Sequence, residues 1–299
     1  MGLKSGYLYD ENIAVYEGKD FKLSNYLSNY KDDLKSQKSG IRHLEQDKST
    51  LYELQQLLYA TDNHSVLLIF QAMDAAGKDS TISHVFSGMF PQGGNVTSFK
   101  VPNSLEIDHD YLWRTQLCLP EKGKIGIFNR SYYEEVLVTK VHPQIILNQR
   151  IPGIKDISQL DENFWNKRYE SIRNHEKHLT QNGTIILKFF LNVSKEEQKK
   201  RFLDRIEKPE KNWKFNMADL KERALWDEYQ KAYEKAIIET ATPNAPWFVI
   251  PADRKWFMRA AVCKIIVEKL KELNLTYPKL EPDALVDLQM AKELLNAEQ

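Results

Sequence analysis

The sequence predicts an α/β fold in which a parallel five-stranded sheet lies between two layers of helices. One observation is the continuous apolar run of residues 65–70 (SVLLIF), which is typical of a strand buried on both faces of a parallel sheet. Another is the alternation of such runs with helical stretches, which favours a sheet covered on both sides. A small-residue loop ending in Gly-Lys directly follows the first run. Because ligands of such folds bind at the carboxyl ends of the strands, the candidate site lies at that edge.

The expected elements form one domain over residues 1–299, with an N-terminal arm and helix (1–60), a core (61–273) and a tail (274–299). Residues 1–22 look irregular, a lid is expected at about 194–225, and a tail helix over 282–299 is expected to pack on the surface or on a neighbouring subunit. The expected strands are 65–70, 96–101, 124–129, 184–190 and 247–251. The expected helices are 49–59, 82–89, 103–117, 157–179, 194–206, 217–238 and 255–270.

The composition is that of a folded globular protein without a global electrostatic field. Lys plus Arg and Asp plus Glu both number 42, so nothing draws the whole chain to nucleic acid or to a membrane surface. A polyanion would therefore need a local basic groove. Cys118 and Cys263 are far apart in apolar patterns, which predicts buried, inert thiols in a reducing compartment. No run reaches the ~18 apolar residues of a membrane span, and the interpretation is a cytoplasmic protein.

The loop at residues 71–81 (QAMDAAGKDST) has the context of a phosphate-binding loop, since it follows a strand and opens a helix. Small residues let backbone N–H groups approach an anion, and Lys78 would neutralise phosphoryl oxygens. Two positions depart from the usual pattern: Ala72 replaces the first Gly and Asp79 replaces the Ser/Thr. A Gly-Lys turn entering a helix by chance is the alternative. The predicted phosphate-binding residues are Ala75, Ala76, Gly77, Asp79 and Ser80.

Asp74 adds a carboxylate to this loop. An acid that faces phosphates is unfavourable unless a cation lies between them, so Asp74 is the candidate ligand for Mg²⁺. Asp79 also has a simpler interpretation, because an acid in the first turn of a helix is favoured by the helix dipole.

The third strand ends in Asn129 and Arg130. An arginine at this edge can stabilise charge on a transferring phosphoryl group. Asn129 stands where an Asp would usually face the metal, and it can accept from a metal-bound water without adding charge. The alternative is that Arg130 only pairs with Glu134 or Glu135 on the next turn.

The helix predicted from residue 194 carries Arg201 and Arg205, which share a face because they are four residues apart. The long polar stretch that follows suits a mobile lid closing over a polyanion, although a solvated charged helix is the alternative. Lys100 and Arg114 are candidates for lining the path of an extended anion. The full predicted channel set is Lys100, Arg114, Glu134, Lys214 and Arg223.

The phrases FQAMDAAGKD, IGIFNRSYYEEVLVTKVHP, LKFFLNVSKEEQKKRFLDRIE and KNWKF resemble the type 2 polyphosphate kinases, and the similarity runs from about residue 51 to 273. Asn129 resembles the branch that accepts both AMP and ADP. The resemblance implies a P-loop kinase fold with a lid, assembled as a homodimer or homotetramer. By motif matching it implies a catalytic set of Asp74, Lys78, Asn129, Arg130, Arg201 and Arg205.

The expected activity is reversible transfer of phosphate between inorganic polyphosphate and nucleotides, from ADP to ATP and from AMP to ADP, with Mg²⁺ as cofactor. Guanine nucleotides are a further candidate class, and no nucleic acid or membrane partner is expected. Direct in-line transfer is expected, because none of the seven histidines lies in the phosphate loop or beside Arg130. Two alternatives stay open: an ATP-dependent nucleoside monophosphate kinase, and a nucleotide-binding regulator without turnover.

Overall fold

A six-stranded sheet with the order β3-β8-β7-β4-β6-β5 forms the centre of the computed structural model, which describes residues 4–5, 8–9, 12–31 and 34–298. Five of its strands are parallel, as predicted, and β3 at one edge runs antiparallel to β8. The sheet is therefore mixed and has one strand more than expected. The two residues of β3 are too few to show an alternating pattern. The strands are β3 (Ala14–Val15), β4 (Ser65–Gln71), β5 (Gly94–Ser98), β6 (Ile125–Asn129), β7 (Thr184–Asn192) and β8 (Trp247–Pro251).

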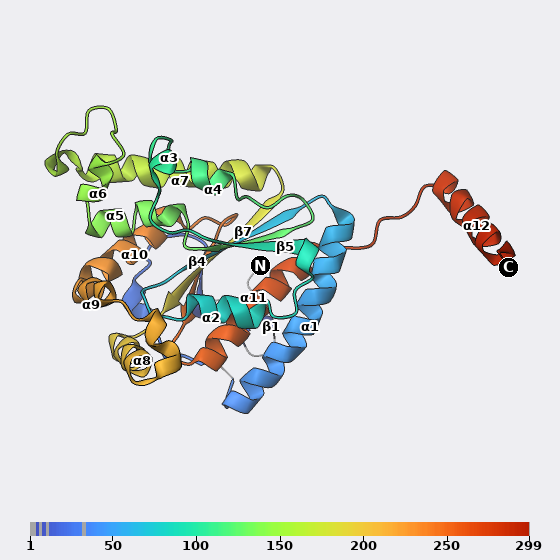
Figure 1. The fold of residues 1–299 in the computed structure, drawn as a ribbon, viewed down its shortest axis with the longest axis horizontal. Coiled ribbons are helices and arrows are strands. Elements are labelled where there is room, and N and C mark those ends of the chain that lie inside the picture. Colours follow the sequence, from blue (N-terminus) through green and yellow to red (C-terminus); the bar gives the residue numbers. More distant parts are fainter. Residues whose placement is uncertain (1–3, 6–7, 10–11, 32–33, 299) are drawn as a thin grey trace.

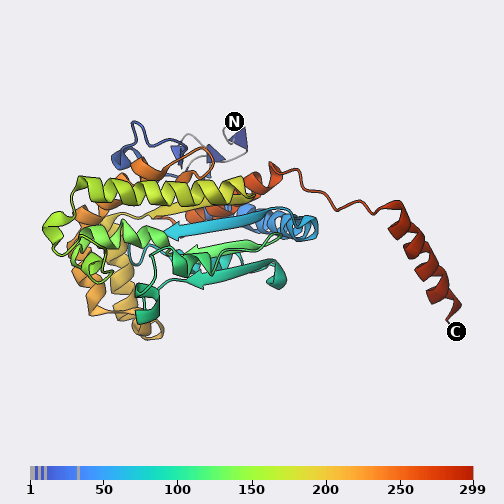
Figure 2. The ribbon, with the colours of Figure 1, turned by 90° about the horizontal axis from the view of Figure 1, so that it is seen from above.

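Helices cover both faces of the sheet (Figures 1 and 2), so the predicted three-layer architecture is confirmed. β4 lies in the middle, and all seven of its residues are buried. The apolar pattern of α11 has no clear polar face because this helix lies between the sheet and α1, where ten of its residues are buried. One layer holds α5 (Val138–Val141), α7 (Glu162–Gln181) and α10 (Trp226–Thr240), and the other holds α1 (Gln37–Thr61), α2 (Lys78–Val85) and α11 (Lys255–Lys271).

Shorter elements connect these layers. The lid segment predicted at about 194–225 contains α8 (Lys195–Glu207), η6 (Pro209–Lys214) and α9 (Met217–Ala224). As predicted, Ser194 caps α8, since its side chain accepts a hydrogen bond from the Glu197 amide. The others are β1 (Lys4–Ser5), β2 (Leu8–Tyr9), η2 (Leu23–Asn25), η3 (Pro91–Gly93), α3 (Ser104–Ile107), α4 (Trp113–Gln116), η4 (Tyr132–Glu135), α6 (Gln144–Leu147) and η5 (Ile157–Gln159).

Five of the predicted helices have wrong boundaries. α2 spans Lys78–Val85 instead of 82–89, because it begins directly after Gly77, and α7 begins at Glu162 instead of 157, after the separate turn η5. α1 starts at Gln37, twelve residues before the expected position, because Ser36 caps it there by accepting from the Ser39 amide. The helix expected over 103–117 is split into α3 and α4, and Asp110 in the break accepts from the Leu112 amide. The helix expected over 217–238 is divided at Leu225 into α9 and α10.

The tail helix α12 (Pro282–Ala297) lies away from the body (Figures 1 and 2) and buries none of its residues. The expectation that it packs on the surface of its own body is therefore wrong.

No helix in the described part of the chain is both long enough and apolar enough to cross a bilayer. Cys263 is buried as predicted, whereas Cys118 is only half-buried, and both are free thiols.

The register of the sheet brings the predicted motifs together. β4 pairs with β6 so that Phe70 lies opposite Asn129, and the Arg130 amide donates to the Phe70 carbonyl at 3.0 Å. β4 pairs on its other side with β7, which leads into α8. Since these strands are parallel and in register, the phosphate loop, the Asn129-Arg130 turn and the start of the lid all leave the same edge.

Candidate active site

The phosphate loop between β4 and α2 reverses direction through two residues with left-handed backbone, Ala75 at φ +60° and Gly77 at φ +105°. Lys78 folds back so that its Nζ donates to the Ala72 carbonyl at 2.7 Å. Within the described part of the chain, the amides of Asp74, Ala75, Gly77 and Lys78 donate no hydrogen bond. The loop therefore presents free amides at the N-terminus of α2, which is the arrangement that binds phosphate.

Arg130 lies between two carboxylates beside this loop. Its Nη2 is 3.2 Å from Asp74 Oδ1, and its Nη1 is 3.7 Å from Glu134 Oε2. Burial opposes its charge, but Glu134 and Asp74 outweigh that effect and raise the pKa of Arg130. Its side chain remains 40% exposed. Arg130 therefore pairs with Glu134 and also lines the cleft, and its role on a transferring phosphoryl group stays a prediction.

Lys78 and Glu134 are influenced by the same cluster of charges. Burial, together with the Arg130 guanidinium, lowers the pKa of Lys78, although Asp74 and Glu134 act in the opposite direction. Burial raises the pKa of Glu134, which Arg130 and Lys78 partly oppose. Two cations, Lys78 and Arg130, and two acids, Asp74 and Glu134, thus meet at the loop. The same two carboxylates favour the charged forms of both cations.

Asn129 and Asp79 are joined directly. The Asn129 Nδ2 donates to Asp79 Oδ1 at 2.5 Å, which holds this carboxylate at the start of α2.

No group of three or more His, Cys, Asp or Glu that could hold a metal occurs among the described residues. Mg²⁺ in phosphoryl-transfer sites is commonly bound by one or two carboxylates together with substrate phosphates and water. The half-buried carboxylate of Asp74 fits that class of ligand.

The two arginines of α8 lie in different surroundings. Arg205 is partly exposed, with its Nη1 3.3 Å from Asp219 Oδ2 on α9. Arg201 is only 7% exposed, and its guanidinium donates to the carbonyls of Ala76 and Ala252, each at 2.6 Å. Arg205 therefore faces the lid segment, whereas Arg201 is bonded to the phosphate loop itself.

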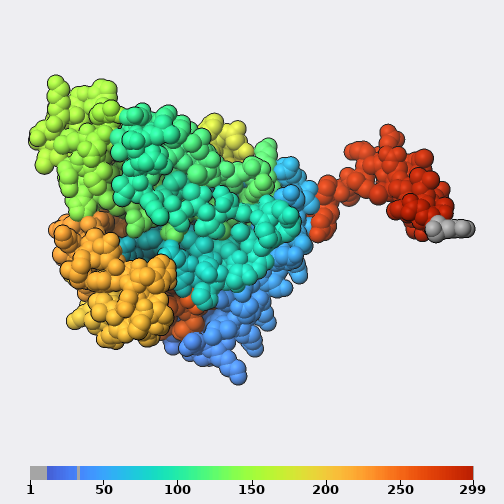
Figure 3. Space-filling view, viewed as in Figure 1, coloured from blue at the N-terminus to red at the C-terminus, as the bar shows by residue number. Residues whose placement is uncertain are grey.

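A cleft of about 670 Å³ opens between the loop and the lid segment. In the space-filling view (Figure 3) the surface is hollowed between the golden lid elements and the teal segment that carries β5. Eight lysines and arginines line the cleft against three aspartates, so it is strongly cationic although the chain has no net charge. The cations are Lys78, Lys100, Arg130, Arg201, Arg205, Lys211, Lys214 and Lys255, and the acids are Asp74, Asp79 and Asp204.

Three members of the predicted channel do not line this cleft. Glu134 pairs with Arg130 at 3.7 Å instead. Arg114 is buried and donates to the Lys100 carbonyl at 2.7 Å, while Arg223 donates to Gln198 Oε1 at 2.7 Å. Lys211 and Lys255 line the cleft but were not predicted. Lys211 belongs to the basic, aromatic stretch after α8 that suggested a lid. Lys255 lies more than fifty residues beyond Arg201 and shows no pattern that marks it.

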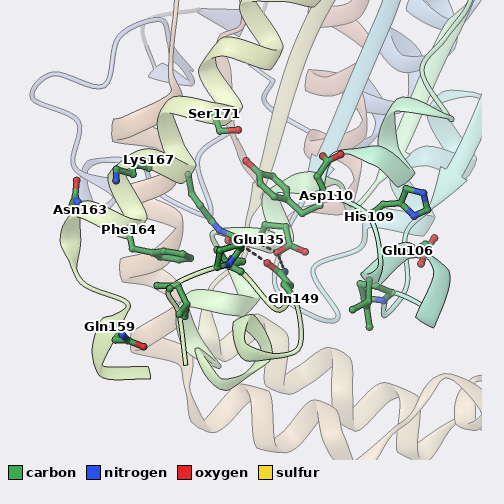
Figure 4. Close-up of a pocket in the computed structure, with 18 of the residues that line it drawn as sticks. Glu106, His109, Asp110, Glu135, Gln149, Gln159, Asn163, Phe164, Lys167 and Ser171 are labelled. Carbon is green, nitrogen blue, oxygen red and sulfur yellow. Dashed lines mark hydrogen bonds and ion pairs between the residues drawn. The ribbon is translucent and has the colours of Figure 1, made fainter. Parts of the chain in front are cut away.

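A second cavity of about 620 Å³ lies against α7 (Figure 4) and contains no residue of the phosphate loop. A buried ion pair between Arg168 and Glu135, 2.8 Å apart, forms part of its wall. The Arg168 guanidinium also lies over the rings of Tyr111 and Phe164, at 4.7 and 5.2 Å. Arg114 lines this cavity instead of the cleft. Its acids and cations nearly balance, which does not suit a polyphosphate chain.

Comparisons with known proteins agree with this geometry. The family model described as polyphosphate kinase 2 matches residues 34–278. The chain belongs to the polyphosphate kinase 2 family. It is therefore an enzyme of phosphate transfer, and this family generally requires a divalent metal.

Relatives of this polyphosphate kinase carry names consistent with that activity. An ADP-polyphosphate phosphotransferase of Rhodopseudomonas palustris is 50% identical over 95% of this chain and 98% of its own length. An AMP/ADP-polyphosphate phosphotransferase of Meiothermus ruber is 48% identical over 77% of this chain and 81% of its own. The crystal structure of polyphosphate kinase 2 from Arthrobacter aurescens superposes with a TM-score of 0.84 at 37% identity, covering 95% of this chain and 96% of that one.

A buried polar network anchors the segment after Arg130 in this polyphosphate kinase. The hydroxyls of Tyr132 and Tyr133 donate to Glu176 Oε1 on α7 at 3.0 and 2.8 Å. Lys188 on β7 lies 2.7 Å from Glu176 Oε2, and neither side chain is more than 1% exposed. Burial lowers the pKa of Lys188, while Glu176 opposes that shift. Sequence reasoning did not find this network, because a lysine within an apolar strand carries no spacing signal.

Proposed function

We propose that this polyphosphate kinase transfers phosphate reversibly between inorganic polyphosphate and adenine nucleotides, converting ADP to ATP and AMP to ADP. The observation that carries the proposal is the cationic cleft built on the phosphate loop, which concentrates eight cations in a chain of zero net charge. The names of the relatives from Rhodopseudomonas palustris and Meiothermus ruber support ADP and AMP as acceptors.

In the proposed reaction, Lys78 and Arg130 hold the phosphoryl group that is transferred. An oxygen of the nucleotide's terminal phosphate forms the new P–O bond as the bond to the next phosphate of the chain breaks, and polyphosphate leaves one unit shorter. The free loop amides stabilise charge on the equatorial oxygens, and Arg205 approaches from the lid. Asp74 would hold Mg²⁺, which when bound neutralises phosphate charge.

The test is an assay without any other triphosphate. Purified protein, Mg²⁺, ADP and long-chain polyphosphate are incubated, and the nucleotides are separated over time; AMP replaces ADP in a second series. ATP formed from ADP, and ADP formed from AMP, are the expected products. No ATP with polyphosphate but turnover with ATP and AMP would indicate the monophosphate kinase, and nucleotide binding without any turnover would indicate the regulator.

Direct transfer is supported by the lining of the cleft. No histidine occurs among the described residues that line it, and the side chain of His84 on α2 is exposed, with its Nδ1 2.8 Å from the Ser80 carbonyl. Initial rates with both substrates varied are expected to give intersecting double-reciprocal lines. Parallel lines together with acid-labile phosphate on a histidine would contradict direct transfer.

We also propose a homodimer or homotetramer in a reducing compartment, the cytoplasm. The exposed apolar side chains of α12, among them Leu285, Leu288 and Leu294, support self-association, and the free thiols of Cys118 and Cys263 support the compartment. Light scattering on the eluted protein measures the mass, and a monomer would contradict the assembly. Guanine nucleotides are tested as acceptors in the same assay.

A further inference from the structure

We propose that Gln198 and Arg201 of α8 form a carbonyl clamp that holds the phosphate loop in its phosphate-binding conformation. Both act through the loop and not on the substrate, so they are positioning residues. The inference rests on the proposed function only in taking a phosphate chain as the ligand of the loop.

The clamp engages three consecutive carbonyls of the loop. Gln198 Nε2 donates to the Asp74 carbonyl at 2.9 Å. Arg201 Nη1 donates to the carbonyls of Ala75 at 3.2 Å and Ala76 at 2.6 Å. Residues 198 and 201 are three apart and therefore share one face of α8. Both are buried, at 1% and 7% exposure, so these contacts are shielded from water.

Holding the carbonyls determines where the amides point. The N–H and C=O of a trans peptide unit lie in one plane and point in opposite directions, so carbonyls held toward α8 leave the amides of the same peptide units pointing away from α8. The amides of Ala75 and Gly77 are thereby left free for a ligand, whereas that of Ala76 donates to the Met73 carbonyl at 3.2 Å. A carbonyl turned into the cleft would repel phosphate. The donors from α8 also polarise these peptide groups, which strengthens their amides as donors. Ala75 has the left-handed backbone that L-residues disfavour, so surrounding contacts must maintain it.

Arg201 also ties the loop to the neighbouring strand end. Its Nη2 donates to the Ala252 carbonyl at 2.6 Å, just after β8, and its Nε donates to Glu197 Oε1 at 2.9 Å. All three guanidinium nitrogens are thus engaged by the protein. Arg205 differs, because its Nη1 donates to the Lys214 carbonyl and pairs with Asp219, both in the lid segment, and within the described part of the chain it donates to no carbonyl of the phosphate loop. The lid role implied by resemblance for both arginines therefore suits Arg205, and we assign Arg201 to the loop.

Gln198 links the clamp to the lid segment. Its Oε1 accepts from Arg223 Nη1 on α9 at 2.7 Å while its Nε2 holds the Asp74 carbonyl. Both ends of the amide are used, one toward the lid and one toward the loop. Arg223, expected in the substrate channel, is thereby placed where it supports the clamp.

The experiment compares Gln198→Glu and Arg201→Lys with Gln55→Glu as a matched control. Gln198→Glu keeps the oxygen that accepts from Arg223 but sets a second oxygen against the Asp74 carbonyl. Arg201→Lys keeps the positive charge but loses the planar guanidinium, whose several nitrogens donate to different acceptors at once. Gln55 on α1 is likewise fully buried and donates to a backbone carbonyl, that of Phe90 at 3.2 Å, away from the cleft. Tripolyphosphate binding is measured by calorimetry in excess Mg²⁺, and thermal unfolding is followed for every variant.

The expected result is weaker tripolyphosphate binding, by about 10- to 100-fold, in both clamp variants, because displacing loop groups by about 1 Å has effects of that size. Gln55→Glu is expected to lower the midpoint of unfolding and to leave the dissociation constant unchanged. Steady-state rates are expected to show a larger rise in KM for polyphosphate than for ADP.

Wild-type affinity in folded Gln198→Glu and Arg201→Lys would overturn the clamp. An equal loss of affinity in Gln55→Glu would also overturn it, since the effect would then be general destabilisation. If Gln198→Glu does not fold, Arg201→Lys decides the question. Tripolyphosphate binding needs no turnover, so a wild-type protein that binds it without forming ATP would refute the proposed function and leave the clamp under test.

Discussion

Arg130 combines a side chain with a proposed catalytic role and a strained backbone, and two substitutions separate these contributions. Its φ of +66° lies in the left-handed region that favours glycine. Its guanidinium faces the cleft and pairs with Asp74 and Glu134. Arg130→Ala and Arg130→Gly both remove the guanidinium, but only glycine relieves the backbone.

The two variants are expected to lose the same activity and to differ in stability. Loss of one group that stabilises transition-state charge lowers the rate by about 10²- to 10³-fold, or about 2.7 to 4 kcal/mol. The left-handed conformation costs a residue with a Cβ about 1 kcal/mol relative to glycine. Both variants leave Asp74 and Glu134 without the Arg130 guanidinium, so the loss of stability from these ion pairs is the same in both and cancels in the comparison. Arg130→Gly is therefore expected to unfold about 2 °C above Arg130→Ala.

Turnover is measured as ATP formed from ADP and polyphosphate, and stability by calorimetry at one protein concentration. Near-normal turnover in either variant would refute the catalytic assignment of Arg130. Equal midpoints of unfolding, or a higher midpoint for alanine, would refute the argument from backbone strain. The two results are independent, so one part of the reasoning can fail without the other.

Three further predictions concern charged side chains. Lys78→Ala is expected to lower turnover by about 10²- to 10³-fold while circular dichroism shows an intact fold, and wild-type rates would contradict its role. Asp74→Asn is expected to raise the Mg²⁺ concentration needed for half-maximal rate; an unchanged midpoint and rate would make Asp74 only a loop-shaping residue. Lys188→Met is expected to destabilise the fold by about 3 to 5 kcal/mol in denaturant titrations, because Glu176 is left buried and unpaired. Burial lowers the pKa of Lys188, so the native state binds fewer protons than the unfolded chain between that lowered pKa and pH ~10.4. The wild type is therefore expected to gain stability from this group as pH rises through that interval, and a gain of the same size in Lys188→Met would contradict this.

Much of the fold could be predicted because its signals are local. The five parallel strands are short apolar runs, and each lies within a few residues of its predicted place. The phosphate loop and the Asn129-Arg130 turn follow two of these strands directly, so parallel pairing was enough to expect them at one edge. Ser194 was likewise recognisable as a helix cap, because capping involves only residues three apart. What failed had little local signal, such as the two-residue strand β3.

The sequence by itself determined the fold class, the edge of the sheet that carries the candidate site and the residue types gathered at that edge, since these depend on patterns within a few residues. Only the tertiary structure decided which cations reach the cleft. Lys255 lines it from the start of α11. The side chains of Arg114 and Arg223 do not reach it, because they are hydrogen-bonded to backbone and side-chain acceptors elsewhere. It also separated Arg201 from Arg205, which look equivalent on a helical wheel. The reason is physical: where a long side chain ends depends on acceptors supplied by distant segments. Four residues along one helix can therefore separate a buried arginine bonded to the phosphate loop from a partly exposed one that pairs with the lid segment.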